Sequence, residues 1–103
     1  MAITVSLKQF EGPLDLLLHL IHQAKVDIKD IFVSEITEQY LESMQGLEEL
    51  DLQTASEFLV MAALLVEIKS RALLPTPPEE SDEEEETPEQ QLIRRLQEYQ
   101  VYK

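Results

Sequence analysis

The sequence has no cysteine and no tryptophan, and it contains only two glycines. Without cysteine the chain can form no disulfide bond, no thiolate zinc site and no cysteine nucleophile, which fits a reducing compartment. Gly12 and Gly46 alone cannot build a glycine-rich phosphate-binding loop. These absences exclude thiolate chemistry and nucleotide binding through such a loop.

Basic residues are also few, with eight Lys and Arg against 21 Asp and Glu and a formal charge of −13. Binding to phosphate backbones depends on clustered Lys and Arg, so this balance argues against direct nucleic-acid binding. The longest apolar run, residues 59–66, is far shorter than the ~20 residues that span a bilayer. The start of the chain lacks the basic and apolar regions of a signal peptide. We therefore expect a cytoplasmic protein without membrane contact.

The acidic residues divide the chain into three parts. Residues 75–86 contain no base and no apolar side chain larger than proline. Such a segment cannot bury enough surface to offset its ordering entropy, and its charges repel one another. The composition predicts a flexible acidic linker over residues 75–87, between a folded domain at 1–74 and a further helix at 88–103. The alternative is a dedicated role for the acidic run, in mimicking nucleic acid or binding a cation.

Local signals predict three helices in the first part. Pro13 opens a helix that runs to about Lys25, because proline is favoured at the first helical position. Ser34 is a plausible cap for the second helix, and Gly46 is expected to end it.

The third helix has a capping box at residues 54–57, although Asp51 could cap an earlier start, and it should end before Pro75. Residues 3–7 alternate like a half-buried strand, and residues 26–28 could pair with them. The expected fold is mostly α: a small, helix-turn-helix-like domain of three helices with at most two short strands.

The third helix is apolar on every side, whereas a surface helix needs an apolar stripe only a little over about 100° wide. Two other helices are too few to cover it, so we infer a second face for another protein. The alternative is that this helix is the centre of a compact bundle. The residues of its core-facing stripe are Phe58, Met61, Ala62, Leu65, Ile68 and Ala72. The surplus apolar residues are Leu59, Val60, Leu64, Val66 and Leu73.

The last segment begins with a capping box at residues 87–90, with proline at the first helical position. A helix of this length is marginal in isolation, so the pattern is typical of a docking segment. Its apolar stripe consists of Leu92, Ile93, Leu96 and Tyr99.

No arrangement of side chains predicts catalysis or a cofactor. His19 and His22 could share a metal, but a catalytic zinc ion needs three protein ligands and no third one accompanies them. The adjacent carboxylates Glu48 and Glu49 have nothing that would separate their pKa values. We therefore expect no enzymatic activity, no metal and no cofactor.

Three segments resemble one known family. Residues 10–18, FEGPLDLLL, are similar to the opening signature of the ScpA family, the bacterial kleisins. Residues 36–41, ITEQYL, and residues 68–75, IKSRALLP, are similar to its second and third blocks, in the same order. The resemblance covers residues 10–75 and is followed by the acidic segment, as in that family.

This resemblance implies a non-catalytic subunit of the SMC–ScpA–ScpB condensin complex, which is associated with the nucleoid and acts in chromosome condensation and segregation. In that family the third helix packs on the SMC coiled-coil neck beside one ATPase head, and an ScpB dimer binds the central segment. The family's C-terminal winged helix, which binds the other head, has no counterpart in these 103 residues, so we expect an N-terminal fragment. The resemblance places SMC-neck binding at Leu59, Val60, Ala63, Leu64, Val66, Lys69, Ser70, Arg71 and Leu73. It places ScpB binding at Leu92, Ile93, Leu96 and Tyr99.

Two other functions remain open from the residues alone. One is a DNA-binding regulator with a helix-turn-helix, although the recognition helix of such a protein would display Lys and Arg. The other is a structural module that self-associates through its third helix.

Overall fold

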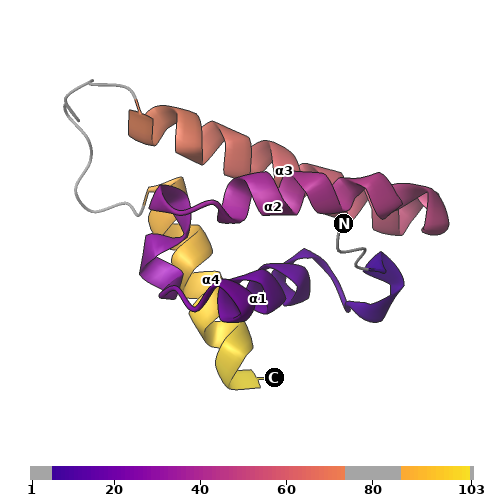
Figure 1. The fold of residues 1–103 in the computed structure, drawn as a ribbon, viewed down its shortest axis with the longest axis horizontal. Helices are drawn as coiled ribbons and strands as arrows, with labels where there is room; N and C mark the ends of the chain where they lie inside the picture. Colours follow the sequence, from indigo (N-terminus) through magenta and orange to yellow (C-terminus); the bar gives the residue numbers. More distant parts are fainter. Residues whose placement is uncertain (1–5, 74–86, 103) are drawn as a thin grey trace.

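The computed structural model describes residues 6–73 and 87–102 (Figure 1). Within these two ranges the chain forms helices and no strand, so the prediction of a mostly-α fold is confirmed. The four α-helices are α1 (Pro13–Ala24), α2 (Ile36–Ser43), α3 (Leu52–Leu73) and α4 (Pro88–Tyr102). Three 3-10 segments, η1 (Leu7–Gln9), η2 (Ile28–Val33) and η3 (Met44–Glu49), connect or precede them.

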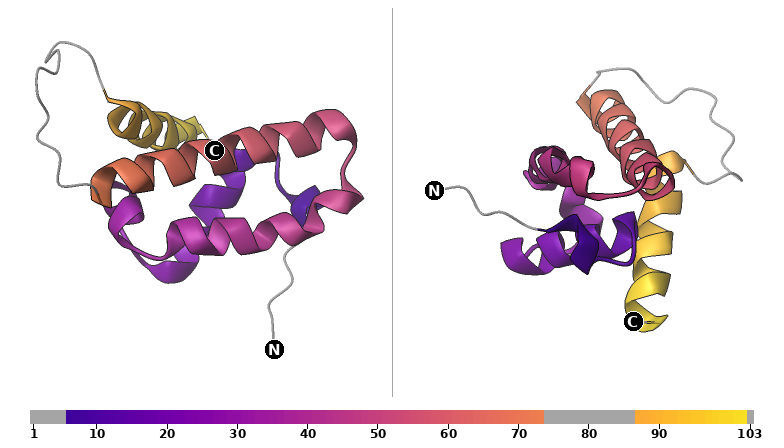
Figure 2. Two further views of the ribbon diagram at one scale, coloured as in Figure 1. Left: turned by 90° about the horizontal axis from the view of Figure 1, so that it is seen from above. Right: turned by 90° about the vertical axis from the view of Figure 1, so that its right-hand side faces the viewer.

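The α2 and α3 helices lie side by side and run in opposite directions, joined through η3 (Figures 1 and 2). The α1 helix packs against α2 on the lower side of the molecule in the view of Figure 1. In the view from above, α4 lies on the opposite side of α3 from α2, and it packs against α1 and η2 (Figure 2). No helix in the described ranges has the length and apolar character needed to cross a membrane.

The boundaries of α1 follow from local chemistry. Pro13 occupies the first turn, as predicted, and Asp15 accepts a hydrogen bond from the backbone N–H of Glu11 at 3.0 Å. At the other end, the N–H of Val26 donates to the carbonyl of Ile21, and Lys25 adopts a left-handed conformation with φ of 59°. These are the marks of a Schellman motif, which satisfies carbonyl groups that the helix end would leave unpaired.

The same motif explains why the predicted strand at residues 26–28 is wrong. The N–H of Val26 is already used at the end of α1, and Ile28 begins η2 rather than a strand. The predicted partner strand also fails at its end, because Leu7 is buried as the first residue of η1. The rest of that segment, residues 3–5, lies outside the described residues. Leu7 therefore makes its core contact from a 3-10 turn and not from a strand.

The ends of α2 and α3 differ in detail from the predictions. Ser34 accepts a hydrogen bond from the N–H of Ile36 at 3.3 Å, one residue before the position that caps α2. Gly46 does not end this helix, because α2 stops at Ser43 and the chain continues through Gly46 as η3. The α3 helix starts at Leu52, and Asp51 caps it, because Asp51 Oδ1 accepts from the N–H of Thr54 at 2.8 Å. The alternative of an earlier start capped by Asp51 is therefore confirmed.

One continuous hydrophobic core holds the helices together. Tyr40 links α2 to α3 by a hydrogen bond, because its buried hydroxyl donates to the carbonyl of Phe58 at 2.9 Å. Burial raises the pKa of Tyr40 well above its ordinary value, so the phenol stays protonated and able to donate. The buried apolar residues are Leu7, Leu16, Leu17, Leu18, Leu20, Ile21, Ile31, Phe32, Ile36, Tyr40, Phe58, Met61, Ala62, Leu65, Ile68, Leu92 and Leu96.

Candidate protein-docking surface

The two faces of α3 differ in their surroundings. Its inner face packs into the core through Phe58, Met61, Ala62, Leu65 and Ile68, as the periodicity predicts. These residues follow the three- and four-residue spacing that puts side chains on one face of a helix. The side chain of Ala72, the last expected member of this stripe, lies outside the described part of the chain.

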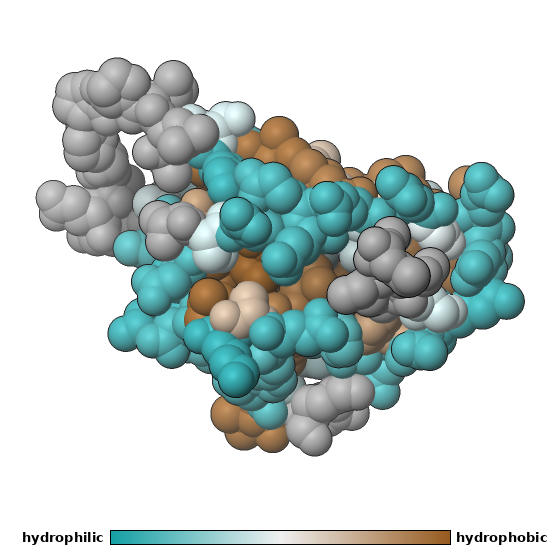
Figure 3. All heavy atoms as spheres, viewed as in Figure 1, coloured by the Kyte–Doolittle hydropathy of each residue, from teal (hydrophilic) through white to brown (hydrophobic). Residues whose placement is uncertain are grey.

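The outer face of α3 is apolar and uncovered. Leu59 is 49% exposed, Val60 69% and Val66 43%, although all three belong to the longest apolar run of the sequence. Figure 3 shows hydrophobic atoms along the upper edge of the molecule, where α3 runs in the same view (Figure 1). Because these three large apolar side chains lie on one helix and stay largely exposed within the described part of the chain, they form the main candidate surface for docking a partner.

The outer face has two edges. Leu59, Ala63, Val66 and Ser70 are spaced by four, three and four residues and form one exposed row, which we call the α3 row. Val60 and the half-buried Leu64 lie on the other edge. The side chain of Leu73, which the sequence placed in the same surface, lies outside the described residues.

Val60 and Leu64 border a groove of about 690 Å³ between three helices. The first turn of α1 supplies Leu14, and α4 supplies Arg95 and Tyr99. The lining of the groove is mainly apolar, and its charged members are three acidic side chains and one basic side chain. The complete lining is Glu11, Gly12, Pro13, Leu14, Asp15, Gln53, Ser56, Glu57, Val60, Met61, Leu64, Arg95 and Tyr99.

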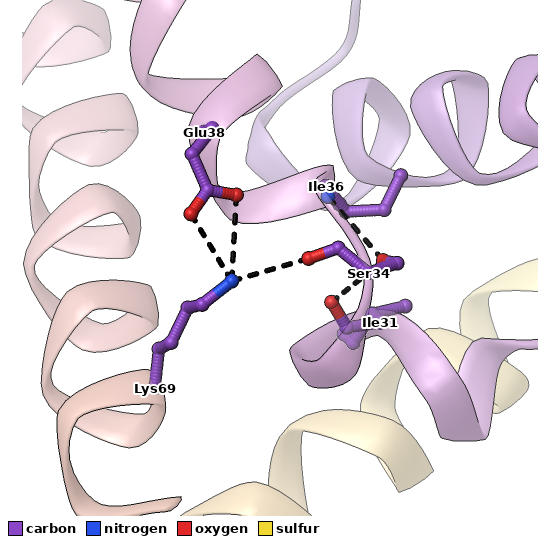
Figure 4. Close-up of polar contacts among 5 residues, drawn as sticks. All are labelled: Ile31, Ser34, Ile36, Glu38 and Lys69. Atoms are coloured by element: carbon purple, nitrogen blue, oxygen red, sulfur yellow. Dashed lines mark hydrogen bonds and ion pairs between the residues drawn. The ribbon is translucent and has the colours of Figure 1, made fainter. Parts of the chain in front are cut away.

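Lys69 and Arg71, which the sequence assigned to the rim of a docking surface, have partners within the chain. Lys69 Nζ lies 3.1 Å from Glu38 Oε2 and donates to the carbonyl of Ser34 at 3.1 Å, so it points toward α2 (Figure 4). The hydrogen bond from Lys69 lowers the pKa of Glu38 below its ordinary value. Arg71 pairs with Glu67 at 3.0 Å, one turn away on the exposed side of α3.

The four residues assigned to ScpB binding lie against the body of the domain. Leu92 is 1% exposed and Leu96 is fully buried, while Ile93 and Tyr99 are partly buried against the same core. The Tyr99 hydroxyl also donates to Glu11 Oε1 at 2.9 Å. No neighbour of this helix was predictable from the sequence pattern, because Glu11 and Tyr99 are 88 residues apart. The groove that α4 helps to form was missed for the same reason.

The two histidines do not form a metal site with other residues of the described ranges, where no three His, Asp or Glu side chains are placed to share a metal ion. His19 packs its ring against Phe10, with the ring centres 5.2 Å apart. His22 Nε2 lies 3.4 Å from Gln100 Nε2, where α1 meets α4. Both histidines therefore contribute to packing between neighbouring segments.

Together these features define a small helical module with one uncovered apolar helix face. The sequence model of the family described as "Segregation and condensation protein ScpA" matches residues 20–103. The chain belongs to this family.

Similar proteins cover almost the whole chain. One named segregation and condensation protein A from Xylella fastidiosa is 54% identical over 99% of this chain and 34% of its own length. Proteins of the same name from Brevibacillus brevis and Coxiella burnetii are each 53% identical, over 100% and 99% of this chain and 43% and 38% of their own lengths. The chain thus spans between a third and a half of the length of these relatives.

Proposed function

We propose that the chain is the N-terminal part of a non-catalytic subunit that acts in chromosome segregation and condensation. Its relatives bear the name of that process, and the chain is 53–54% identical to the part of them that it matches, over 99–100% of its own length. We further propose that α3 docks on the head-proximal coiled coil of an SMC ATPase, as the resemblance implies. The single observation that carries this docking site is the exposed apolar outer face of α3.

The chemistry of this face fits a helical partner. The α3 row alternates large and small side chains, and its small members are Ala63 and Ser70. Small side chains allow two helices to approach closely. An apolar row at helical spacing packs into a groove between the side-chain rows of another helix, whereas a small-molecule site is usually a deeper pocket. A coiled coil offers such a groove over many turns.

The free energy available from covering the outer face of α3 is small, which favours attachment of the chain at more than one place. Covering the exposed surface of Leu59, Val60 and Val66 contributes about 2 kcal/mol per side chain at 25 cal/mol per Å². Association itself costs about 4–15 kcal/mol, so this face alone gives weak binding. A second tethered contact would raise the avidity without any change in α3. We propose that α4 supplies it, by binding an ScpB dimer through Leu92, Ile93, Leu96 and Tyr99.

The test of the α3 site is co-elution of the chain with an SMC fragment that contains the head and the adjacent coiled coil. The double variant Leu59→Asp and Val66→Asp is expected to lose co-elution, because each change places a charge in the proposed apolar contact. The matched control is Val101→Asp, which changes an exposed valine on α4.

Helicity and unfolding temperature should stay close to those of the unmodified chain in both variants. Unchanged binding of the double variant would refute the α3 site. A stable homodimer in sedimentation that the same double variant abolishes would instead assign the face to self-association.

A further inference from the structure

We infer that α4 is a reversible latch: it occupies a docking site on α1 and η2 in the free chain, and it must leave that site before another protein can bind its apolar face. The inference rests on the proposed binding of ScpB to α4. It concerns the state of the chain before that binding.

The buried residues of α4 cannot pack in the domain core and against a partner protein at the same time. Leu92 and Leu96 lie in the core of the domain, at 1% and 0% exposure. A side chain that is buried against α1 and η2 cannot also be buried against a second protein. Either these residues have no role in partner binding, or α4 exchanges one apolar environment for another.

The docked position of α4 combines buried apolar packing with polar contacts at the surface. Its buried anchors are Leu92 and Leu96, one turn apart, while Val101 near its end is 87% exposed. Two polar contacts across the junction, Tyr99 with Glu11 and Gln100 with His22, lie at the surface. Hydrogen bonds at exposed positions add little because water replaces them readily. The latch requires this attachment to open more readily than the core between α2 and α3.

The covalent connection allows α4 to move away while α3 stays folded. Thirteen residues, 74–86, separate the described end of α3 from the described part that contains α4. A chain of that length reaches at most about 45 Å at ~3.5 Å per residue. This reach is comparable to the longest dimension of the molecule, 43 Å. Release of α4 therefore needs no unwinding of α3.

The latch predicts that partner affinity depends on the released fraction of α4. When only a small fraction is competent, the measured dissociation constant is larger than the intrinsic one by the reciprocal of that fraction. A chemical lock on α4 should lower that fraction further and weaken binding. Loosening the junction should strengthen it.

The absence of cysteine makes a selective lock straightforward. In the double variant His22→Cys and Gln100→Cys, the two thiols replace side chains whose nitrogen atoms lie 3.4 Å apart across the α1–α4 junction. A short bis-maleimide reagent with a cleavable spacer can join them. The controls are the same double variant before joining, the joined protein after cleavage, and each single variant treated with the reagent.

ScpB binding is then measured by titration with the full chain in each state. We expect the joined protein to bind at least about tenfold more weakly, a change of about 1.4 kcal/mol, and the cleaved protein to recover. Equal binding in the joined and unjoined states would overturn the latch while leaving the ScpB proposal intact. Absence of binding in the unjoined and unmodified chains would overturn the ScpB proposal and the latch with it.

Hydrogen exchange gives a readout that does not depend on ScpB. In the unmodified chain, amides of α4 should exchange at least about tenfold faster than the slowest amides of α1, because they become exposed by local release. Joining the two cysteines should slow the exchange of α4 and leave that of α3 unchanged. Equal protection of α1 and α4 in the free chain would show that α4 is a permanent part of the fold.

Discussion

The α3 and α4 helices both carry an apolar stripe in the sequence. They differ in how much apolar surface the fold leaves exposed on each. The α3 helix fills the core with one face and leaves Leu59, Val60 and Val66 uncovered on the other. The α4 helix has a single apolar stripe, and its central residues Leu92 and Leu96 are buried within the domain. Periodicity thus identifies an apolar face, whereas the number of such faces on a helix indicates whether one remains for a partner.

The largest expected effect separates the two faces of α3. Leu65→Ala removes a fully buried side chain and should lower the free energy of unfolding by about 2–5 kcal/mol. Val60→Ala, on the outer face, should change it by no more than about 0.5 kcal/mol. Urea unfolding followed by circular dichroism measures both. Similar losses in the two variants would mean that the outer face is covered in solution.

An intermediate effect tests whether α4 is as integral as α3. Leu96 is as deeply buried as Leu65, but Leu96→Ala should lower the free energy of global unfolding by less than about 2 kcal/mol. The loss is limited because α4 can detach before the rest of the domain unfolds. The matched control on the same helix is Val101→Ala, which should change nothing measurable.

Hydrogen exchange of the Leu96→Ala variant should show a loss of protection confined to α4. A parallel loss across α1, α2 and α3 would mean that all four helices unfold as one unit. In that case the contrast between α3 and α4 would disappear.

The smallest effect concerns Lys69, which belongs to the covered side of α3. Its hydrogen bond holds the pKa of Glu38 below the ordinary 4.5, so the pair stabilises the folded chain fully above pH 4.5. That contribution is lost as the pH falls through the lower pKa of the folded state. Lys69→Met should therefore lower the unfolding temperature at neutral pH, and the difference from the unmodified chain should shrink in acid.

Arg71→Met serves as the control, because Arg71 pairs with Glu67 on the exposed side of the same helix. Exposed pairs of this spacing contribute little, so its unfolding temperature should stay close to that of the unmodified chain. A difference between Lys69→Met and the unmodified chain that stays constant down to strongly acid pH would assign the effect of Lys69 to its bond with Ser34 alone.

Features with a local cause were predictable from the sequence. Pro13 marks the start of α1 because its lack of an N–H and its fixed backbone angle suit the first turn. The exposure of Leu59, Val60 and Val66 followed from counting the helices available to cover α3. The position of Lys69 was also accessible: it lies four residues after Leu65, a spacing that places it on the inner face.

Features with a distant cause, or without their usual signal in the sequence, were not predictable. The strand at residues 26–28 failed because the Schellman motif at Lys25 consumes the N–H that a ladder would use, and such a motif usually contains glycine. The packing of α4 depends on contacts such as Tyr99 with Glu11, which leave no periodic signal in either segment. Whether SMC and ScpB bind the proposed surfaces stays a prediction.

The groove beside Val60 and Leu64 has a consequence for how any partner would recognise this edge of the molecule. Its walls come from α1, α3 and α4, three segments that are far apart in the sequence. A helix laid along it would therefore contact a discontinuous epitope that exists only in the assembled tertiary structure. A peptide with the sequence of α3 alone would carry the outer face but lack the contacts from Leu14, Arg95 and Tyr99.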